Sequence, residues 1–86
     1  MALYIKSDGT YEEIEIPRQE SLKFLQEKVR GYIEIVYPAV PNADYEGLVV
    51  NEEGRLLGLP VNVMAAALFG PILTGDVIAF KPGEVD

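Results

Sequence analysis

The chain of 86 residues contains no cysteine and no histidine. Without cysteine there is no disulfide and no thiolate metal site. Without histidine the chain lacks the commonest general base, the commonest zinc ligand and the usual pH-sensitive side chain. Its few hydroxyl groups stand beside turns and helix starts, and no pattern pairs one of them with a base. We therefore expect no metal, no cofactor and no enzymatic activity.

Basic residues are also few, because 7 Lys and Arg face 14 Asp and Glu, for a net charge of -7. Binding to a phosphate backbone requires clustered Lys and Arg, and in this sequence they are dispersed. We expect no direct nucleic-acid binding and no membrane binding. A basic protein surface fits the charge better as a partner. An acidic DNA mimic is an alternative, but it requires carboxylates in phosphate-like rows.

No hydrophobic run approaches the roughly 20 residues of a membrane span. The longest, residues 61–69, is interrupted by Asn62. The N-terminus shows no signal-peptide pattern. These features favour a cytoplasmic protein with one domain over residues 1–81 and a flexible tail over 82–86.

The first sixteen residues have the pattern of a β-hairpin. Asp8-Gly9 is typical of a two-residue turn between strands. That turn predicts the pairs Ser7–Thr10, Ile5–Glu12, Leu3–Ile14 and Met1–Ile16. In this register Tyr4 and Tyr11 share the outer face of the hairpin.

A helix is predicted over residues 21–30, followed by a strand over 32–37. The helix is expected to begin at Ser21 as N-cap and to end before Gly31. Its predicted buried stripe contains Leu22, Leu25 and Val29. A loop with two prolines is expected over residues 38–46.

The second half contains the densest folding signals. An apolar strand, 48–50, is predicted at the centre of the sheet, and a turn with a left-handed Gly54 follows it. The remaining predictions are a return strand over 55–57, a helix over 63–69 capped by Asn62, and a strand over 77–80. The order ββαβββαβ indicates an α+β domain with one mixed sheet, similar in element order to β-grasp domains.

Two asparagines and several large side chains are candidate binding residues. Asn51 and Asn62 each stand where a turn or helix begins, so either they serve the backbone or they converge on a small, nucleotide-like ligand. Tyr4, Tyr11 and Tyr45 are candidates for an interface, because tyrosine is enriched in such surfaces.

The second predicted helix is unusually apolar for its length. Its residues and the one before it include Val61, Val63, Met64, Leu68 and Phe69. One buried stripe cannot hold them all, so some are expected at the surface. Met64 and Phe69 are therefore further candidate binding residues, and a homodimer through this helix is one possible outcome.

Three segments resemble a small bacterial and bacteriophage family known chiefly as a domain of unknown function. They are Asn51-Glu-Glu-Gly54, Gly58-Leu-Pro-x-Asn62 and Gly75-Asp-Val-Ile78. The resemblance implies a phage or mobile-element context and brings no catalytic residues. The leading hypothesis is therefore a non-enzymatic interaction domain that binds a host protein in the host cytoplasm.

Overall fold

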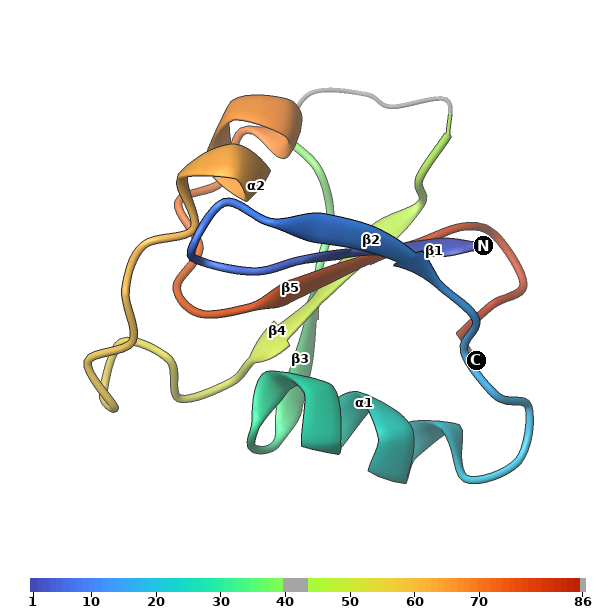
Figure 1. Cartoon of the computed structure of the whole chain (residues 1–86). Coiled ribbons are helices and arrows are strands. Elements are labelled where there is room, and N and C mark those ends of the chain that lie inside the picture. The colour runs from blue at the N-terminus through green and yellow to red at the C-terminus, as the bar shows by residue number, and fades with distance from the viewer. Residues whose placement is uncertain (40–43, 86) are drawn as a thin grey trace.

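One antiparallel sheet organises the protein (Figure 1). The computed structural model describes residues 1–39 and 44–85, and in them the sheet has the order β2-β1-β5-β4-β3. The elements are β1 (Ala2–Ile5), β2 (Tyr11–Ile14), α1 (Ser21–Val29), β3 (Ile33–Val36), β4 (Gly47–Asn51), α2 (Val63–Phe69) and β5 (Val77–Phe80). The predicted α+β class is confirmed. The sheet is antiparallel rather than mixed, since all its neighbouring strands run in opposite directions.

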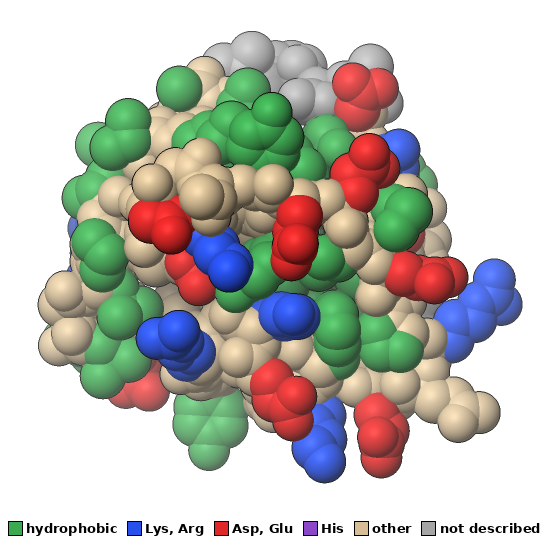
Figure 2. Space-filling view, viewed as in Figure 1, with side chains coloured by type: hydrophobic (Ala, Val, Ile, Leu, Met, Phe, Trp, Pro, Cys, Tyr) green, Lys and Arg blue, Asp and Glu red, His purple; other side chains and the backbone are tan. Residues whose placement is uncertain are grey.

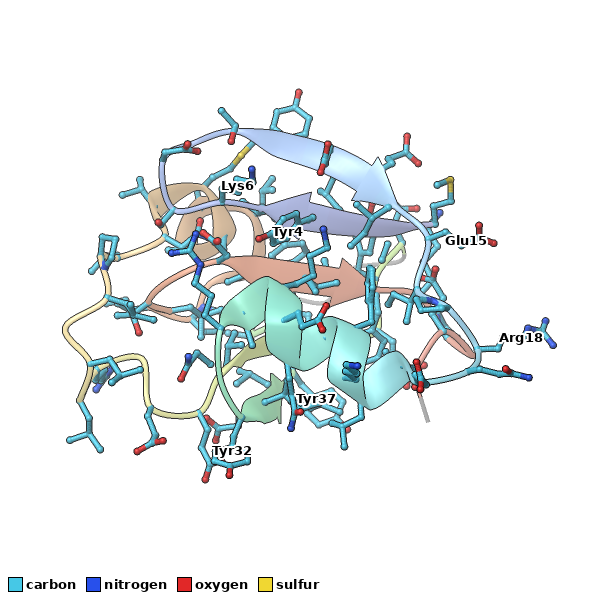
Figure 3. All side chains as sticks on the ribbon, turned by 60° about the horizontal axis from the view of Figure 1, so that its bottom comes forward. Tyr4, Lys6, Glu15, Arg18, Tyr32 and Tyr37 are labelled. Atoms are coloured by element: carbon cyan, nitrogen blue, oxygen red, sulfur yellow. The ribbon has the colours of Figure 1, made fainter. Side chains whose placement is uncertain are left out.

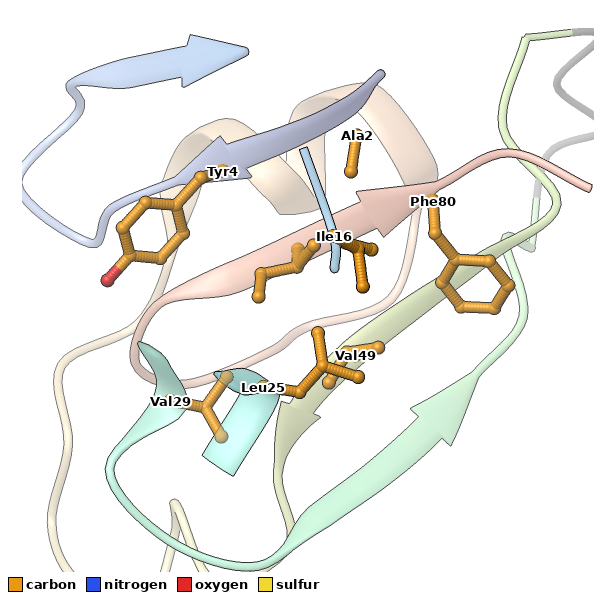
Figure 4. Close-up of a cluster of buried hydrophobic side chains, with 8 residues drawn as sticks. Ala2, Tyr4, Ile16, Leu25, Val29, Val49 and Phe80 are labelled. Carbon is orange, nitrogen blue, oxygen red and sulfur yellow. The ribbon is translucent and has the colours of Figure 1, made fainter. Parts of the chain in front are cut away.

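Helices cover both faces of this sheet, α1 on one side and α2 on the other (Figure 1). The first core cluster lies on the α1 side (Figure 4) and contains Ala2, Tyr4, Ile16, Leu25, Val29, Val49, Ile78 and Phe80. The second lies on the α2 side and contains Ile5, Leu48, Val50, Ala65, Phe69, Leu73, Val77 and Ala79. Side chains alternate between faces along a strand, so two cores require strands that are apolar at every position. The predicted central place of residues 48–50 is thereby confirmed.

The hairpin forms, but the predicted register is wrong by one residue. The Thr10 amide donates to the Asp8 carboxylate over 2.9 Å, and the Lys6 amide donates to the Thr10 carbonyl over 2.8 Å. The loop therefore holds three residues instead of two. The observed pairs are Ala2–Ile14, Leu3–Glu13, Tyr4–Glu12 and Ile5–Tyr11. Tyr4 consequently lies in the first core cluster, and Tyr11 lies opposite Ile5 on the other face.

Helix α1 occupies the predicted segment with a different buried stripe and different caps. Leu25 and Val29 are buried as predicted, whereas Leu22 is 55% exposed. The residue before the helix is Glu20, which is left-handed at φ 57 and makes no side-chain cap, so Ser21 is not the N-cap. The helix ends at Val29, and its C-cap residue Arg30 takes the left-handed conformation at φ 63.

The predicted return strand over 55–57 does not form. Gly54 closes the predicted turn by donating to the Asn51 carbonyl over 3.2 Å, but its φ is not positive. Further turns follow, in which the Leu57 amide donates to the Glu53 backbone carbonyl over 2.9 Å. Successive local bonds of this kind leave no ladder for a strand, and Leu56 projects into solvent with 85% of its surface exposed.

Helix α2 and strand β5 have the predicted boundaries, 63–69 and 77–80. Of the segment expected to be a flexible tail, the structure describes residues 82–85. The Glu84 carboxylate accepts from the Lys81 amide over 2.6 Å and lies 3.8 Å from the N-terminal ammonium. Val85 packs against the first core cluster.

Candidate binding surfaces

Asn51 is a buried junction between the end of α1 and the turn after β4. Its side-chain amide donates to the carbonyls of Val29 and Arg30 over 3.0 and 3.3 Å. Its side-chain oxygen accepts from the Glu53 amide over 2.8 Å. A Cβ added at Gly31 would lie 2.7 Å from the Asn51 nitrogen, so Gly31 supplies space for this contact. Asn51 therefore satisfies the carbonyls that a helix C-terminus leaves unpaired.

Asn62 connects three elements from a position with 0% exposure. Its side-chain oxygen accepts from the Ala65 amide over 3.0 Å, which confirms the predicted N-cap of α2. Its side-chain nitrogen donates to the carbonyls of Ile5 and Gly75, each over 3.0 Å. One amide thus joins β1, α2 and the turn before β5.

These bonds bear on the hypothesis of a small ligand held by both asparagines. Both amide nitrogens already donate to two backbone carbonyls each. Asn51 borders a hollow of about 240 Å³ beside β3, but its amide donors are directed at α1. Asn62 lies among backbone groups below α2. The observed geometry therefore supports the backbone roles and adds no support to a shared ligand site.

Tyr4 places a polar hydroxyl group beside α1 on the α1 side of the sheet. Its hydroxyl lies 3.0 Å from the Lys28 carbonyl and 3.1 Å from one oxygen of Asp76, so its single proton has two acceptors. The other oxygen of Asp76 accepts from the Ser7 amide over 2.9 Å. Burial, together with the neighbouring Asp76 carboxylate, raises the pKa of Tyr4 to about 12.

Basic side chains that are distant in sequence meet around this tyrosine. The Lys28 and Lys6 ammonium groups lie 5.2 and 5.7 Å from the centre of the Tyr4 ring. Arg30 lines the same hollow of about 310 Å³ as Tyr4 and Lys6. Figure 2 shows Lys and Arg side chains gathered between the hairpin and α1, and Figure 3 shows Lys6 beside Tyr4. No local pattern in the sequence indicates this group, because it forms only when the end of α1 packs beside Tyr4 of β1.

The other predicted binding residues have different environments. Tyr11 is 61% exposed, whereas Phe69 is only 1% exposed and belongs to the second core cluster. Tyr45 is half-buried and meets the Phe69 ring edge to face, with 6.0 Å between ring centres. Met64 is half-buried at the border of the same cluster. The structure thus brings Tyr45, Met64 and Phe69 together at the second core cluster. It does not bring the two asparagines, Tyr4 and Tyr11 into one site with them.

The outward side of α2 is apolar, and we call it the α2 surface. It consists of Val63, Met64, Ala67 and Leu68. At about 100° per residue these four side chains share one arc of the helix, opposite Ala65 and Phe69 in the core. Val63 is 72% and Leu68 46% exposed. Figure 2 shows hydrophobic side chains gathered over α2. The sequence correctly predicted a surplus of apolar groups on this helix, although Val63 and Leu68 were not selected as binding residues.

The structure also bears on metal and membrane sites. Among residues 1–39 and 44–85, no three His, Cys, Asp or Glu side chains come together in a way that could hold a metal ion. Within the same ranges, no helix has both the length and the apolar character needed to cross a membrane.

By its fold, the protein belongs to the class of small α+β domains. A family model described as a domain of unknown function, DUF3846, matches residues 1–85, so the chain belongs to that family. No curated protein and no solved structure matches the chain.

Proposed function

We propose that the protein is a non-enzymatic interaction domain that binds a partner protein through the α2 surface. The observation that carries this proposal is the composition of α2, which has no polar side chain on either side. A helix on a protein surface normally presents a polar face to water. Val63 and Leu68 instead present branched apolar groups, which gain free energy when a partner removes them from water.

The proposed partner offers an apolar groove bordered by Lys or Arg. The apolar groove matches α2, and the basic border matches the net charge of -7. If the gene is carried by a phage or mobile element, as the resemblance of the sequence implies, that partner is a host protein.

A capture experiment with matched variants tests this proposal. The bait is immobilised wild-type protein, the Val63→Glu/Leu68→Glu variant, or the control Leu22→Glu. Leu22 is 55% exposed on α1, on the opposite side of the sheet. We expect wild type and the control to retain one protein stoichiometrically from host lysate, and the double variant to lose it. Equal retention by the double variant, or no retained protein in any arm, would contradict the proposal.

A further inference from the structure

The free side of β3 is an unpaired sheet edge, which we call the β3 edge. β3 pairs with β4 in the register Ile33–Asn51 and Ile35–Val49, and no described strand lies on its other side. The Glu52 amide donates to the Tyr32 carbonyl over 2.8 Å, so Tyr32 and Glu52 form a hydrogen-bonded pair. Antiparallel pairs alternate, and the backbone N–H and C=O groups of Ile33 and Ile35 therefore point away from β4.

The two edges of the sheet differ in how well they are protected against pairing with a strand from another molecule. β2, at the other edge, carries the exposed acids Glu12 and Glu13, which discourage strand addition. β3 has Glu34 as its single charged residue. Tyr32 and Tyr37 stand at its two ends, 67% and 66% exposed (Figure 3). An edge with aromatic ends and a mainly apolar strand is suited to receive another strand.

We propose that the β3 edge pairs with the β3 edge of a second copy of this chain, antiparallel, with the two-fold axis at Ile35. A two-fold axis perpendicular to the sheet keeps the α1 sides of both copies on one face. Residues with outward backbone groups then oppose one another, Ile35 with Ile35 of the second copy and Ile33 with Tyr37. Glu34 lies opposite Val36 between these pairs.

The sequence of β3 selects this register among its neighbours. Aromatic and β-branched residues directly opposite each other stabilise a strand pair, and Ile33 with Tyr37 forms such a pair twice. A shift that centres the axis on Glu34 would place two carboxylates face to face, which is destabilising. The β3 edge is thus complementary in sequence to the β3 edge of a second copy.

This pairing would join the two sheets and leave both α2 surfaces free on one side of the dimer. A partner with two binding sites would then be held by both copies, which raises apparent affinity without a new contact. The pairing itself does not depend on the function proposed for α2.

Cysteine variants test the register, because the natural chain has no cysteine. In the proposed dimer the Cα atoms of Ile35 and its symmetry mate lie about 5.5 Å apart, within the reach of a disulfide. Tyr37 and its mate are offset by four positions, roughly 13 Å along the strand. We expect Ile35→Cys to cross-link rapidly under mild oxidation and Tyr37→Cys, the more exposed thiol, to remain largely uncross-linked. Equal cross-linking of both variants, or preferential cross-linking of Glu34→Cys, would overturn the proposed pairing.

Sedimentation equilibrium tests the pairing without cysteine. We expect the wild type to approach twice its monomer mass of 9.5 kDa as concentration rises, and more readily at high salt, which screens the charge of -7 on each copy. Ile35→Lys should restore the monomer mass, whereas Leu22→Lys should not, with circular dichroism confirming that both are folded. A wild-type mass that stays monomeric at the highest accessible concentration would overturn the proposal.

Discussion

At the scale of single residues, the buried side-chain amide of Asn62 joins β1, α2 and the turn before β5. The N-cap role of Asn62 follows from its position next to a helical segment, because the cap bond reaches only three residues ahead, to Ala65. Its bonds to the carbonyls of Ile5 and Gly75 span 57 and 13 residues. Such contacts depend on the tertiary fold, so the local pattern could not indicate them.

Replacing Asn62 tests whether these three bonds act together. Asn62→Ala removes the cap, worth about 1 kcal/mol, and removes the side-chain donor from two buried carbonyls. We expect the free energy of unfolding in urea to fall by about 2–4 kcal/mol. Asn62→Asp keeps the accepting oxygen but loses both donors, so it should be destabilised as well. A loss under about 0.5 kcal/mol for both variants would show that the amide is dispensable.

The raised pKa of Tyr4 predicts how the free energy of unfolding depends on pH. Its pKa is 10.0 in the unfolded chain and about 12 in the folded protein, because burial and Asp76 disfavour the tyrosinate. The stabilisation linked to this shift is complete below pH 10 and is lost as pH rises toward 12, since the unfolded state releases its proton first. Urea titrations across this range should show a shallower decline for Tyr4→Phe than for wild type. Parallel declines would contradict the raised pKa.

At the scale of elements, predictions succeeded where residues that start and stop an element flank it. Asn62 and Gly70 bracket α2, and the turn at Gly75 precedes β5, so their boundaries follow from local chemistry. The predicted hairpin register was wrong because the loop holds three residues, and within it the Asp8 carboxylate accepts from the Thr10 amide. A change of one residue in a loop moves every side chain of a strand to the opposite face.

The sequence predicted that Gly54 is needed for a left-handed backbone. The structure shows instead that glycine is needed there for space. Its φ is not positive, but an added Cβ would overlap the Thr74 hydroxyl oxygen. We expect Gly54→Ala to lower the free energy of unfolding by about 1–3 kcal/mol through overpacking. Thr74→Ala should recover part of that loss in a double-mutant cycle. Gly58 has a φ of 70, and an added Cβ there would meet nothing within 4 Å. The loss of stability in Gly58→Ala therefore comes from backbone strain, and Thr74→Ala should not recover it. Additive effects of Gly54→Ala and Thr74→Ala would rule out the predicted contact.

At the scale of the whole molecule, the two cores explain which fold-level predictions held. Strand 48–50 is apolar at each position, and that pattern correctly indicated a strand buried on both faces. The alternating pattern of the hairpin suggested instead that one of its faces was open to solvent. In the structure β1 lies between both helices, and Tyr4 and Ile5 enter opposite cores. The sequence shows the periodicity of a strand. Whether both faces of that strand are covered depends on the strands and helices that pack around it in the fold.

Two valines on opposite faces provide a matched test of this two-core arrangement. Val49 belongs to the α1 side and Val77 to the α2 side, and both are 0% exposed. If both faces are true cores, Val49→Ala and Val77→Ala should each lower the free energy of unfolding by about 2 kcal/mol, through lost burial and a residual cavity. Val63→Ala, at 72% exposure, should change it by less than about 0.5 kcal/mol. Chemical denaturation of the three variants measures this directly, and tolerance at Val77 with loss at Val49 would reduce the molecule to one core, with α2 only loosely attached.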